Sequence, residues 1–548
     1  MERPPNNNPN NNMDPPSPPE TPSPDASPSS GQWSKILRNA AVVGAGTLLS
    51  RIVGLVRDQV TAYYFGASLA ADAFFVAFRL PNLLRSLLAE GALTPAFVST
   101  FTERLTKEGP ASAAAFFRGA MTLLGLILLG VTLLGLWLAP EMILVLAPGF
   151  KDDPERFRLA ILLARIVFPY IFFISLTALA MGALNSLGKF NIPALGPVLL
   201  NVAMILGAVV LSPRMEEPIV GLAIGALVGG IIQLAIQLPF LKKIGPFLGL
   251  SLDFRDPAIK KTLRLMAPAA LGVAAYQISI FVNTQLASFL PYGSVSFLYY
   301  ADRLAQFPLG VFTLALSTAV LPALAKVKAE GRMAEFETVY RSSLGLQFFI
   351  TLPAMVGLMV MGEALVALLF ERGQFGPDHT LATAQALWAY VLGLPFLSGT
   401  SLAARAFFSL SDTKTPAKIA AISLGLGLIL AMILLWPLKH VGLALASSLA
   451  SMINFIWLNQ ALAKRQGYKF RALVKEIGLS SWWAILMGLI LWPLYYRPEL
   501  AFLGRLGQVA IGLILGTGIY FSLAYLFKSP HLEAVRSRLR RRSKRSKT

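Results

Sequence analysis

Long apolar segments separated by short polar ones make up most of the chain. A helix needs about 20 apolar residues to cross the hydrocarbon core of a membrane. Two helices, at about residues 39–64 and 70–102, are apolar but interrupted by charges. Twelve further segments of at least 20 residues contain no Asp, Glu, Lys or Arg: 119–140, 166–188, 190–213, 218–241, 265–301, 304–325, 342–362, 379–404, 419–438, 441–463, 477–496 and 506–527. The pattern predicts an all-α polytopic membrane protein with about 14 transmembrane helices.

Composition agrees with this interpretation, since 55% of the residues are hydrophobic and only 14% are charged, against about 25% charged in soluble globular proteins. These proportions exclude a large soluble helical protein. The chain has no cysteine, which excludes disulfides and cysteine-ligated metals. Its three histidines, His379, His440 and His531, are far apart in the sequence, so we predict no metal site.

The formal net charge of +20 could indicate a nucleic-acid partner, but the distribution of basic residues indicates a membrane orientation instead. With the N-terminus inside, the cytoplasmic segments hold 33 of the 48 Lys and Arg residues, and the outside loops hold 7. Lys and Arg concentrate in the cytoplasmic loops of membrane proteins. We therefore predict that both termini are cytoplasmic, that the basic C-terminal segment touches anionic membrane lipids, and that nucleic acid is not a partner.

The two halves of the chain resemble each other. Arg79-Leu80 recurs as Arg303-Leu304, and Pro95-Ala96 recurs as Pro322-Ala323, with further matches in the same order at a nearly constant spacing. The repeat predicts two parallel six-helix repeats plus two C-terminal helices, with the substrate site between the repeats. The predicted divisions are a disordered cytoplasmic tail without a signal peptide (1–34), an N-terminal lobe (35–245), a C-terminal lobe (246–466), helices 13 and 14 (467–528) and a basic cytoplasmic tail (529–548).

Charges inside the predicted helices are concentrated in the first two helices and the eighth. Intramembrane charges are costly and usually mark a transport pathway. All eight basic residues within the helices are arginines, whose planar fork grips phosphate in two places. The segments 51–90 and 302–303 together hold five arginines and four acids, so a net positive cavity remains if the acids pair with arginines. Such a cavity suits an anion that is too polar to cross lipid unaided.

These charges divide into two predicted roles. The residues predicted to bind the substrate are Arg51, Arg57, Arg85 and Arg303. The residues predicted to form gating or structural ion pairs are Asp58, Asp72, Glu90, Asp302 and Arg79. We predict no catalytic residue and no metal ligand, and interpret the protein as a carrier rather than an enzyme.

Several motifs closely resemble the MurJ/MviN lipid II flippase family of the multidrug/oligosaccharidyl-lipid/polysaccharide exporter superfamily. They are SRIVGLVRD (50–58), ADAFFVAFRLPNLLR (71–85), APGF (147–150), YYADRL (299–304) and KTP (414–416). The resemblance covers about residues 35–528. It implies a fourteen-helix fold of two six-helix lobes, with the last two helices forming a groove for a polyprenyl tail.

The resemblance also implies residue roles and a biological setting. The family's essential arginines fall on Arg51, Arg57, Arg85 and Arg303, and its important helix-2 aspartate falls on Asp72. The implied substrate is lipid II, undecaprenyl-pyrophosphate-disaccharide-pentapeptide. The implied setting is peptidoglycan synthesis and cell shape at a bacterial inner membrane, with membrane lipids and cell-wall synthesis proteins as the other candidate partners.

The predicted mechanism is alternating access, in which Arg57, Arg85 and Arg303 bind the pyrophosphate and the lipid tail stays in the bilayer. No Walker motif is present, so we expect no cofactor and a drive from the membrane potential or an ion gradient, with the ion unidentified. Three alternatives stay open. They are a flippase for another lipid-linked oligosaccharide, a multidrug/cation antiporter, which would need acids to dominate its cavity, and a membrane glycan polymerase, which would need a catalytic carboxylate in a long outside loop.

Overall fold

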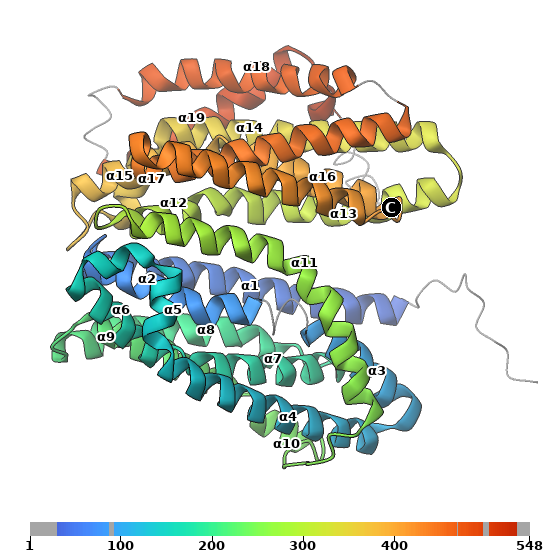
Figure 1. Cartoon of the computed structure of the whole chain (residues 1–548). Coiled ribbons are helices and arrows are strands. Elements are labelled where there is room, and N and C mark those ends of the chain that lie inside the picture. Colours follow the sequence, from blue (N-terminus) through green and yellow to red (C-terminus); the bar gives the residue numbers. More distant parts are fainter. Residues whose placement is uncertain (1–29, 87–92, 468–469, 497–503, 534–548) are drawn as a thin grey trace, which may run out of the picture.

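The computed structural model describes residues 30–86, 93–467, 470–496 and 504–533, and within these residues every regular element is helical (Figure 1). Eight helical stretches there are long and apolar enough to cross a membrane. The prediction of an all-α polytopic membrane protein is confirmed, while the number of about 14 transmembrane helices stays a prediction.

A first helix group is formed by the N-terminal part of the chain. It comprises α1 (Ser30–Phe65), α2 (Leu69–Leu84), α3 (Thr94–Glu108), α4 (Pro110–Trp137), α5 (Ala139–Leu146), the short η2 (Pro148–Asp152), α6 (Pro154–Val167), α7 (Tyr170–Ser186), α8 (Asn191–Leu206), η3 (Gly207–Leu211), η4 (Ser212–Arg214), α9 (Ile219–Ala235) and α10 (Leu238–Ile244). Because α1 begins at Ser30, the last residues of the predicted tail, 30–34, are helical, which corrects that boundary. The rest of the predicted tail lies outside the described residues.

The second helix group follows α11 (Pro257–Ser288), which crosses from one group to the other (Figure 1). This group comprises α12 (Ser294–Pro308), η5 (Leu309–Thr313), α13 (Leu314–Ala329), α14 (Met333–Phe370), α15 (Pro377–Val391), α16 (Leu394–Ser409), α17 (Lys414–Gln466), α18 (Phe470–Tyr495) and α19 (Gly504–Leu526). The long α17 is kinked at Lys439, whose φ of 51° and ψ of −132° are not helical, so it supplies two of the predicted spans.

The two groups share a local pattern after α2 and α12. A π-helical turn follows α2 at residues 85–86, and the π-helix η5 follows α12, which ends at Pro308. A π turn has one residue more than an α-helical turn and is frequent at functional sites. Both turns follow helices that carry intramembrane arginines, Arg79 in α2 and Arg303 in α12.

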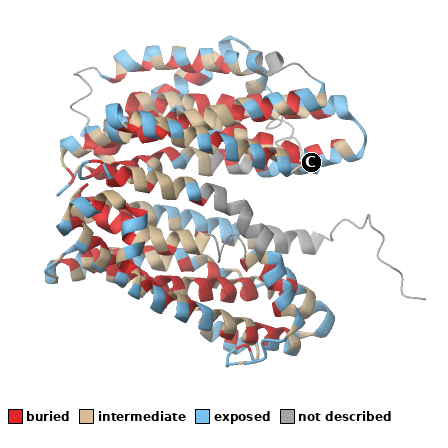
Figure 2. Ribbon diagram, in the orientation of Figure 1, coloured by how far each residue is buried: buried red, intermediate tan, exposed pale blue. Residues whose placement is uncertain are grey.

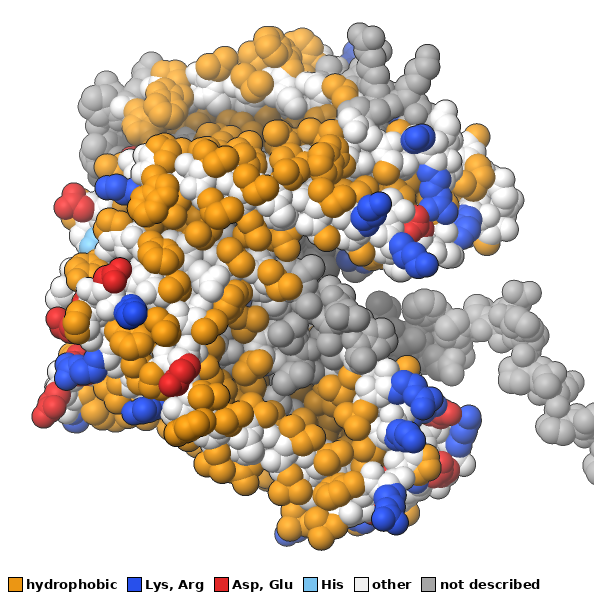
Figure 3. Space-filling view, in the orientation of Figure 1, with side chains coloured by type: hydrophobic (Ala, Val, Ile, Leu, Met, Phe, Trp, Pro, Cys, Tyr) orange, Lys and Arg blue, Asp and Glu red, His pale blue; other side chains and the backbone are white. Residues whose placement is uncertain are grey.

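The groups meet at one end and are separated at the other. We call the first the closed end; there α2, α6, α12 and α15 lie together (Figure 1). The backbone N–H of Gln374 donates to the carbonyl oxygen of Tyr63 at 2.9 Å across the two groups. Gly373 (φ 59°) has no room for a side chain, because its Cβ would lie 2.4 Å from that carbonyl oxygen. At the other, open end, near α3 and α13, the molecule is hollowed between the groups (Figure 3).

Large apolar side chains cover much of both groups on the face that Figure 3 shows. Trp137 and Trp436, for example, are 74% and 73% exposed. The buried residues lie inside each group and where the groups touch at the closed end (Figure 2). A soluble protein rarely exposes apolar patches of this extent, whereas a helix facing lipid needs an apolar exterior. The apolar exterior therefore agrees with a position in the membrane.

Candidate functional site

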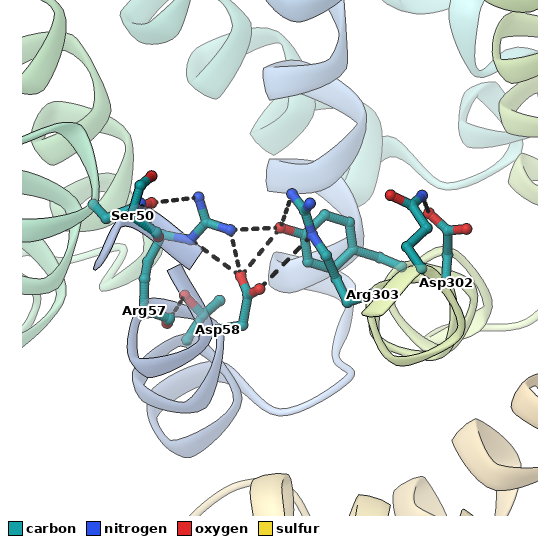
Figure 4. A network of polar contacts seen from close by, with 9 residues as sticks. Ser50, Arg57, Asp58, Asp302 and Arg303 are labelled. Carbon is teal, nitrogen blue, oxygen red and sulfur yellow. Dashed lines mark hydrogen bonds and ion pairs between the residues drawn. The ribbon is translucent and has the colours of Figure 1, made fainter. Parts of the chain in front are cut away.

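Two arginines and an aspartate from opposite helix groups converge between α1 and α12 (Figure 4). Arg57 donates from Nε and Nη2 to Oδ1 of Asp58, at 3.0 and 2.5 Å, and from Nη1 to Oδ1 of Asn201 on α8, at 3.0 Å. The hydroxyl of Tyr299 lies 2.9 Å from Arg57 Nη2 and 3.2 Å from Arg303 Nη2, and it donates to Asp58 at 3.1 Å. We call these five residues the central network.

The members of the central network differ in their access to solvent. Arg57 and Asp58 are only 8% and 4% exposed, and each of the three guanidinium nitrogens of Arg57 already has a protein partner. The side chain of Arg303 is 46% exposed, and its Nε lies 3.7 Å from Asp58 Oδ2. Because Asp58 accepts from Arg57 and also faces Arg303, the cluster carries more positive than negative charge, and the excess lies on the arginine that a ligand can reach.

Aromatic packing fixes the position of Tyr299 in this network. Its ring stacks on Phe75 of α2, with centroids 4.0 Å apart and an interplanar angle of 22°. The guanidinium carbon of Arg303 lies 5.0 Å from the centre of the same ring. Stacked aromatic pairs and cation–π contacts are both favourable at these distances. The phenol is thus held between the helix groups with its hydroxyl among three charged side chains.

The other predicted binding residues lie apart from the central network, Arg51 on α1 and Arg85 directly after α2. Arg51 is exposed on α1, and its guanidinium lies against Gly310 of η5, where a Cβ would come within 2.1 Å of Nη1. Arg85 is partly buried and donates from Nε to Asn82 at 3.3 Å. Gly310 therefore gives the Arg51 guanidinium room to reach the second group.

The remaining predicted ion-pair residues have polar partners. Arg79 donates to Thr284 of α11, and Asp302 accepts a hydrogen bond from Gln306. Glu90 lies outside the described residues. No group of three or more His, Asp or Glu side chains in the described part of the chain is placed to hold a metal ion.

Asp72 lies at the closed end, in the first turn of α2, and it is fully buried. Its Oδ2 accepts from Nη2 of Arg156 at 2.7 Å and from the backbone N–H of Gly293 at 2.8 Å. Its Oδ1 accepts from the backbone N–H and the hydroxyl of Ser296, at 2.8 and 2.6 Å. The carboxylate of the first group thereby caps the N-terminus of α12 in the second group. We call Asp72, Arg156, Gly293 and Ser296 the latch.

A second, more exposed contact lies beside the latch. Tyr292, which precedes α12, donates its hydroxyl to Asp153, the N-cap of α6. This hydrogen bond lowers the pKa of the Asp153 carboxyl below its usual value of 3.8 and raises the pKa of the Tyr292 phenol above 10.0. The contact is therefore strongest where the carboxyl is ionised and the phenol is protonated.

The sequence analysis missed five members of these clusters, Asn201 and Tyr299 of the central network and Arg156, Gly293 and Ser296 of the latch. Tyr299 and Asn201 lie in apolar helices, where such residues serve equally well as packing contacts. The apolar pattern places Arg156 in an outside loop between the predicted helices at 119–140 and 166–188, but it lies on the first turn of α6 and is only 3% exposed. A signal for this position existed, because Asp153-Pro154 is a typical N-cap and first helical residue, which places Arg156 inside the helix.

The membrane protein has two helix groups that meet at the closed end, with arginines between them. This is the architecture of a carrier that opens to one side of the membrane at a time. A family model described as "Lipid II flippase MurJ" matches residues 61–502. The chain belongs to this family.

Individual members of the family align with this chain over nearly their whole lengths. "Probable lipid II flippase MurJ" of Vibrio cholerae is 37% identical, over 90% of this chain and 96% of the relative. "Lipid II flippase MurJ" of Burkholderia cenocepacia is 35% identical, over 90% of this chain and 97% of the relative. A solved structure, "Lipid II flippase MurJ, inward closed conformation", superposes with a TM-score of 0.75 at 28% identity, covering 89% of this chain and 98% of that one.

Proposed function

We propose that this chain is a lipid II flippase that moves the precursor from the cytoplasmic to the outer leaflet of a bacterial inner membrane by alternating access. Membership of the family supports lipid II over another lipid-linked oligosaccharide and over a multidrug substrate. The observation that carries the mechanism is Arg303, whose side chain is 46% exposed and lies between the two helix groups that meet at the closed end.

The open end faces the cytoplasm in this proposal. The basic loops around 241–264 and 326–341 lie at that end, as does the start of α1 (Figure 1), and Lys and Arg side chains gather there (Figure 3). The positive-inside rule favours this orientation, with both termini in the cytoplasm. The latch then closes the outer side.

In the state described here the head group enters from the cytoplasm and its pyrophosphate meets Arg303, with Arg51 and Arg85 along the same path. Arg57 is held by Asp58, Asn201 and Tyr299, so it reaches the pyrophosphate only when the central network rearranges. Phosphate competes with a carboxylate for the same bidentate donors, which provides a reason for that rearrangement. Outward movement of negative charge is favoured by about 2.3 kcal/mol per elementary charge per 100 mV of inside-negative potential.

The polyprenyl tail remains in lipid during transport. The surface of α19 offers apolar side chains to such a chain, among them Ile514, Leu515 and Leu523. Burying a long hydrocarbon chain along apolar side chains needs no specific polar contact. A role for the last two helices in holding the tail remains a prediction.

The test is complementation in bacteria whose own lipid II flippase can be switched off. The wild-type gene is compared with Arg57→Ala, Arg303→Ala and a control, Arg158→Ala, which removes an arginine that is 77% exposed. We expect wild type and control to restore growth and the two site variants to fail at equal membrane levels. Failure of well-expressed wild type would contradict the assigned substrate, and full activity of both site variants would contradict the assigned site.

A further inference from the structure

Arg156 has no role in the proposed binding site, yet its surroundings at the closed end are unusually organised. It is almost completely buried and pairs with Asp72, the only carboxylate of the latch. Its guanidinium carbon lies 3.8 Å from the ring centre of Phe150 and 5.4 Å from that of Tyr292. Phe150 belongs to the first helix group and Tyr292 leads into the second, so the cation lies where the two groups meet.

The charges and the neutral donors of the latch are divided between the two groups. The first group holds both charged partners, Asp72 on α2 and Arg156 on α6. The second group contributes only neutral donors, which are the two N–H groups of Gly293 and Ser296 and the Ser296 hydroxyl. Separating the groups therefore breaks hydrogen bonds to neutral donors, while the ion pair stays intact.

This division matters because a buried charge without its partner is costly. Breaking a buried ion pair by removing one side costs far more than breaking a hydrogen bond whose groups can return to water. An ion pair across the interface would have to be broken at every opening. An ion pair within one group keeps Asp72 ionised and oriented whether the closed end is shut or open.

We propose that Arg156 is the positioning residue of the outer gate. It holds the Asp72 carboxylate charged and aimed at the N-terminus of α12, so that the latch closes against neutral donors and opens without separating an ion pair. The inference rests on the proposed function only for the statement that this end opens during transport.

The test measures the separation of the two groups directly. The chain has no native cysteine, so two introduced cysteines give a reporter without background. Glu216 lies beside Glu217, which pairs with Arg158 of α6, and Asp378 lies in the first turn of α15. Glu216→Cys and Asp378→Cys therefore place spin labels at exposed positions of the first and second groups, next to helices of the closed end. Double electron–electron resonance of the full-length protein in lipid vesicles then reports the distance distribution across that end.

Three variants in this labelled background isolate the role of Arg156. We expect Arg156→Gln to raise the ratio of long to short distances about tenfold, because the closed form must then bury an uncompensated carboxylate. Arg156→Lys restores the charge and should return most of the short-distance population. In an Asp72→Asn background, Arg156→Gln should no longer raise this ratio, because the carboxylate that Arg156 compensates is gone and the change removes a buried cation that has lost its partner.

Two outcomes would overturn the proposal. One is an unchanged distance distribution in Arg156→Gln, even if the variant is less stable, because a residue important only for folding would give that result. The other is that Arg156→Gln changes the ratio of long to short distances equally with and without the Asp72→Asn change, because Arg156 would then act through another group. Failure of both Arg156→Gln proteins to fold would lead to the same conclusion. The distance measurement needs no lipid II. A negative result for Arg156 can therefore be distinguished from a wrong assignment of the substrate.

Discussion

The central network and the latch are both arginine–aspartate clusters between the same two helix groups, but they divide their charges differently. In the latch both charges belong to the first group. In the central network, Arg57 and Asp58 come from α1, and a second arginine, Arg303, comes from α12. The latch is neutral overall and closed, whereas the central network has two arginines for one aspartate, and the second arginine is half-exposed. We propose that this difference separates a gate, which needs reversible closure, from a binding site, which needs an excess of positive charge.

The comparison predicts that the two central arginines differ in their contribution to stability. Arg57→Ala leaves Asp58 buried without its main partner and should lower the free energy of unfolding by about 3–5 kcal/mol. Arg303→Ala removes a side chain that is 46% exposed, and should cost about 1 kcal/mol or less. Chemical denaturation of the purified proteins in detergent checks this. Equal destabilisation by the two changes would contradict the contrast between a buried arginine that is bonded to the protein and a half-exposed one.

Closure can be disturbed without touching a charge. Gly373→Ala adds a Cβ that would lie 2.4 Å from the Tyr63 carbonyl oxygen, so we expect the closed end to be forced apart and the long-distance population of the label pair to rise about tenfold. Gly331→Ala is the matched control, because Gly331 also has a positive φ, 72°, but nothing within 4 Å of its Cβ. A similar shift in both variants would assign the effect to backbone strain instead.

The hydroxyl of Tyr299 should contribute to transport by joining the charged side chains of the central network. Tyr299→Phe keeps the stacking on Phe75 but removes the group shared by Arg57, Asp58 and Arg303. Hydrogen bonds to charged groups are worth about 1.5–3 kcal/mol, so we expect a transport rate reduced about tenfold with the fold retained. Transport measured in vesicles, with circular dichroism as the control for folding, checks this. An unchanged rate would mean that the phenol only packs.

The smallest expected effect concerns pH at the rim of the latch. Because the Tyr292 hydroxyl lowers the pKa of Asp153, this contact contributes fully above the usual carboxyl pKa of 3.8 and is lost as the pH falls through the lowered value. Acidification below 3.8 should therefore slightly increase the long-distance population of the label pair. Tyr292→Phe should remove that component of the pH dependence. If the long-distance population of Tyr292→Phe depends on pH as strongly as that of the wild type, another group is responsible for the titration.

Much of this picture is accessible from the sequence. Apolar segments longer than 20 residues predict the helices, and the restriction of intramembrane basic residues to arginine predicts a site for an anion. Arg57, Asp58 and Arg303 belong to helices far apart in the chain, and the structure brings them together as one cluster. The repeated Arg-Leu motif in α2 and α12 was the main sign that these helices are related.

The latch could not be predicted because its chemistry lies in three-dimensional contacts between ordinary residues. Two of the partners of Asp72 are backbone N–H groups, which have no signature in side-chain pattern. Arg156 follows a run of charged residues that resembles a solvent-exposed loop, and only the burial of the first turn of α6 against α2 reveals its role. Similarly, Tyr299 differs from other aromatic residues of the core only in what its hydroxyl touches.

We propose that Arg303, the half-exposed arginine between the helix groups, binds the lipid-linked pyrophosphate. The most direct measurement is the transfer of lipid II head groups across vesicles containing the purified protein, comparing wild type with Arg303→Ala, Arg303→Lys and the control Arg158→Ala. We predict that Arg303→Ala lowers the rate at least about tenfold, that Lys restores only part of it because it lacks the planar fork, and that the control transports normally. A wild-type transport rate in Arg303→Ala would contradict the proposal that Arg303 binds the pyrophosphate.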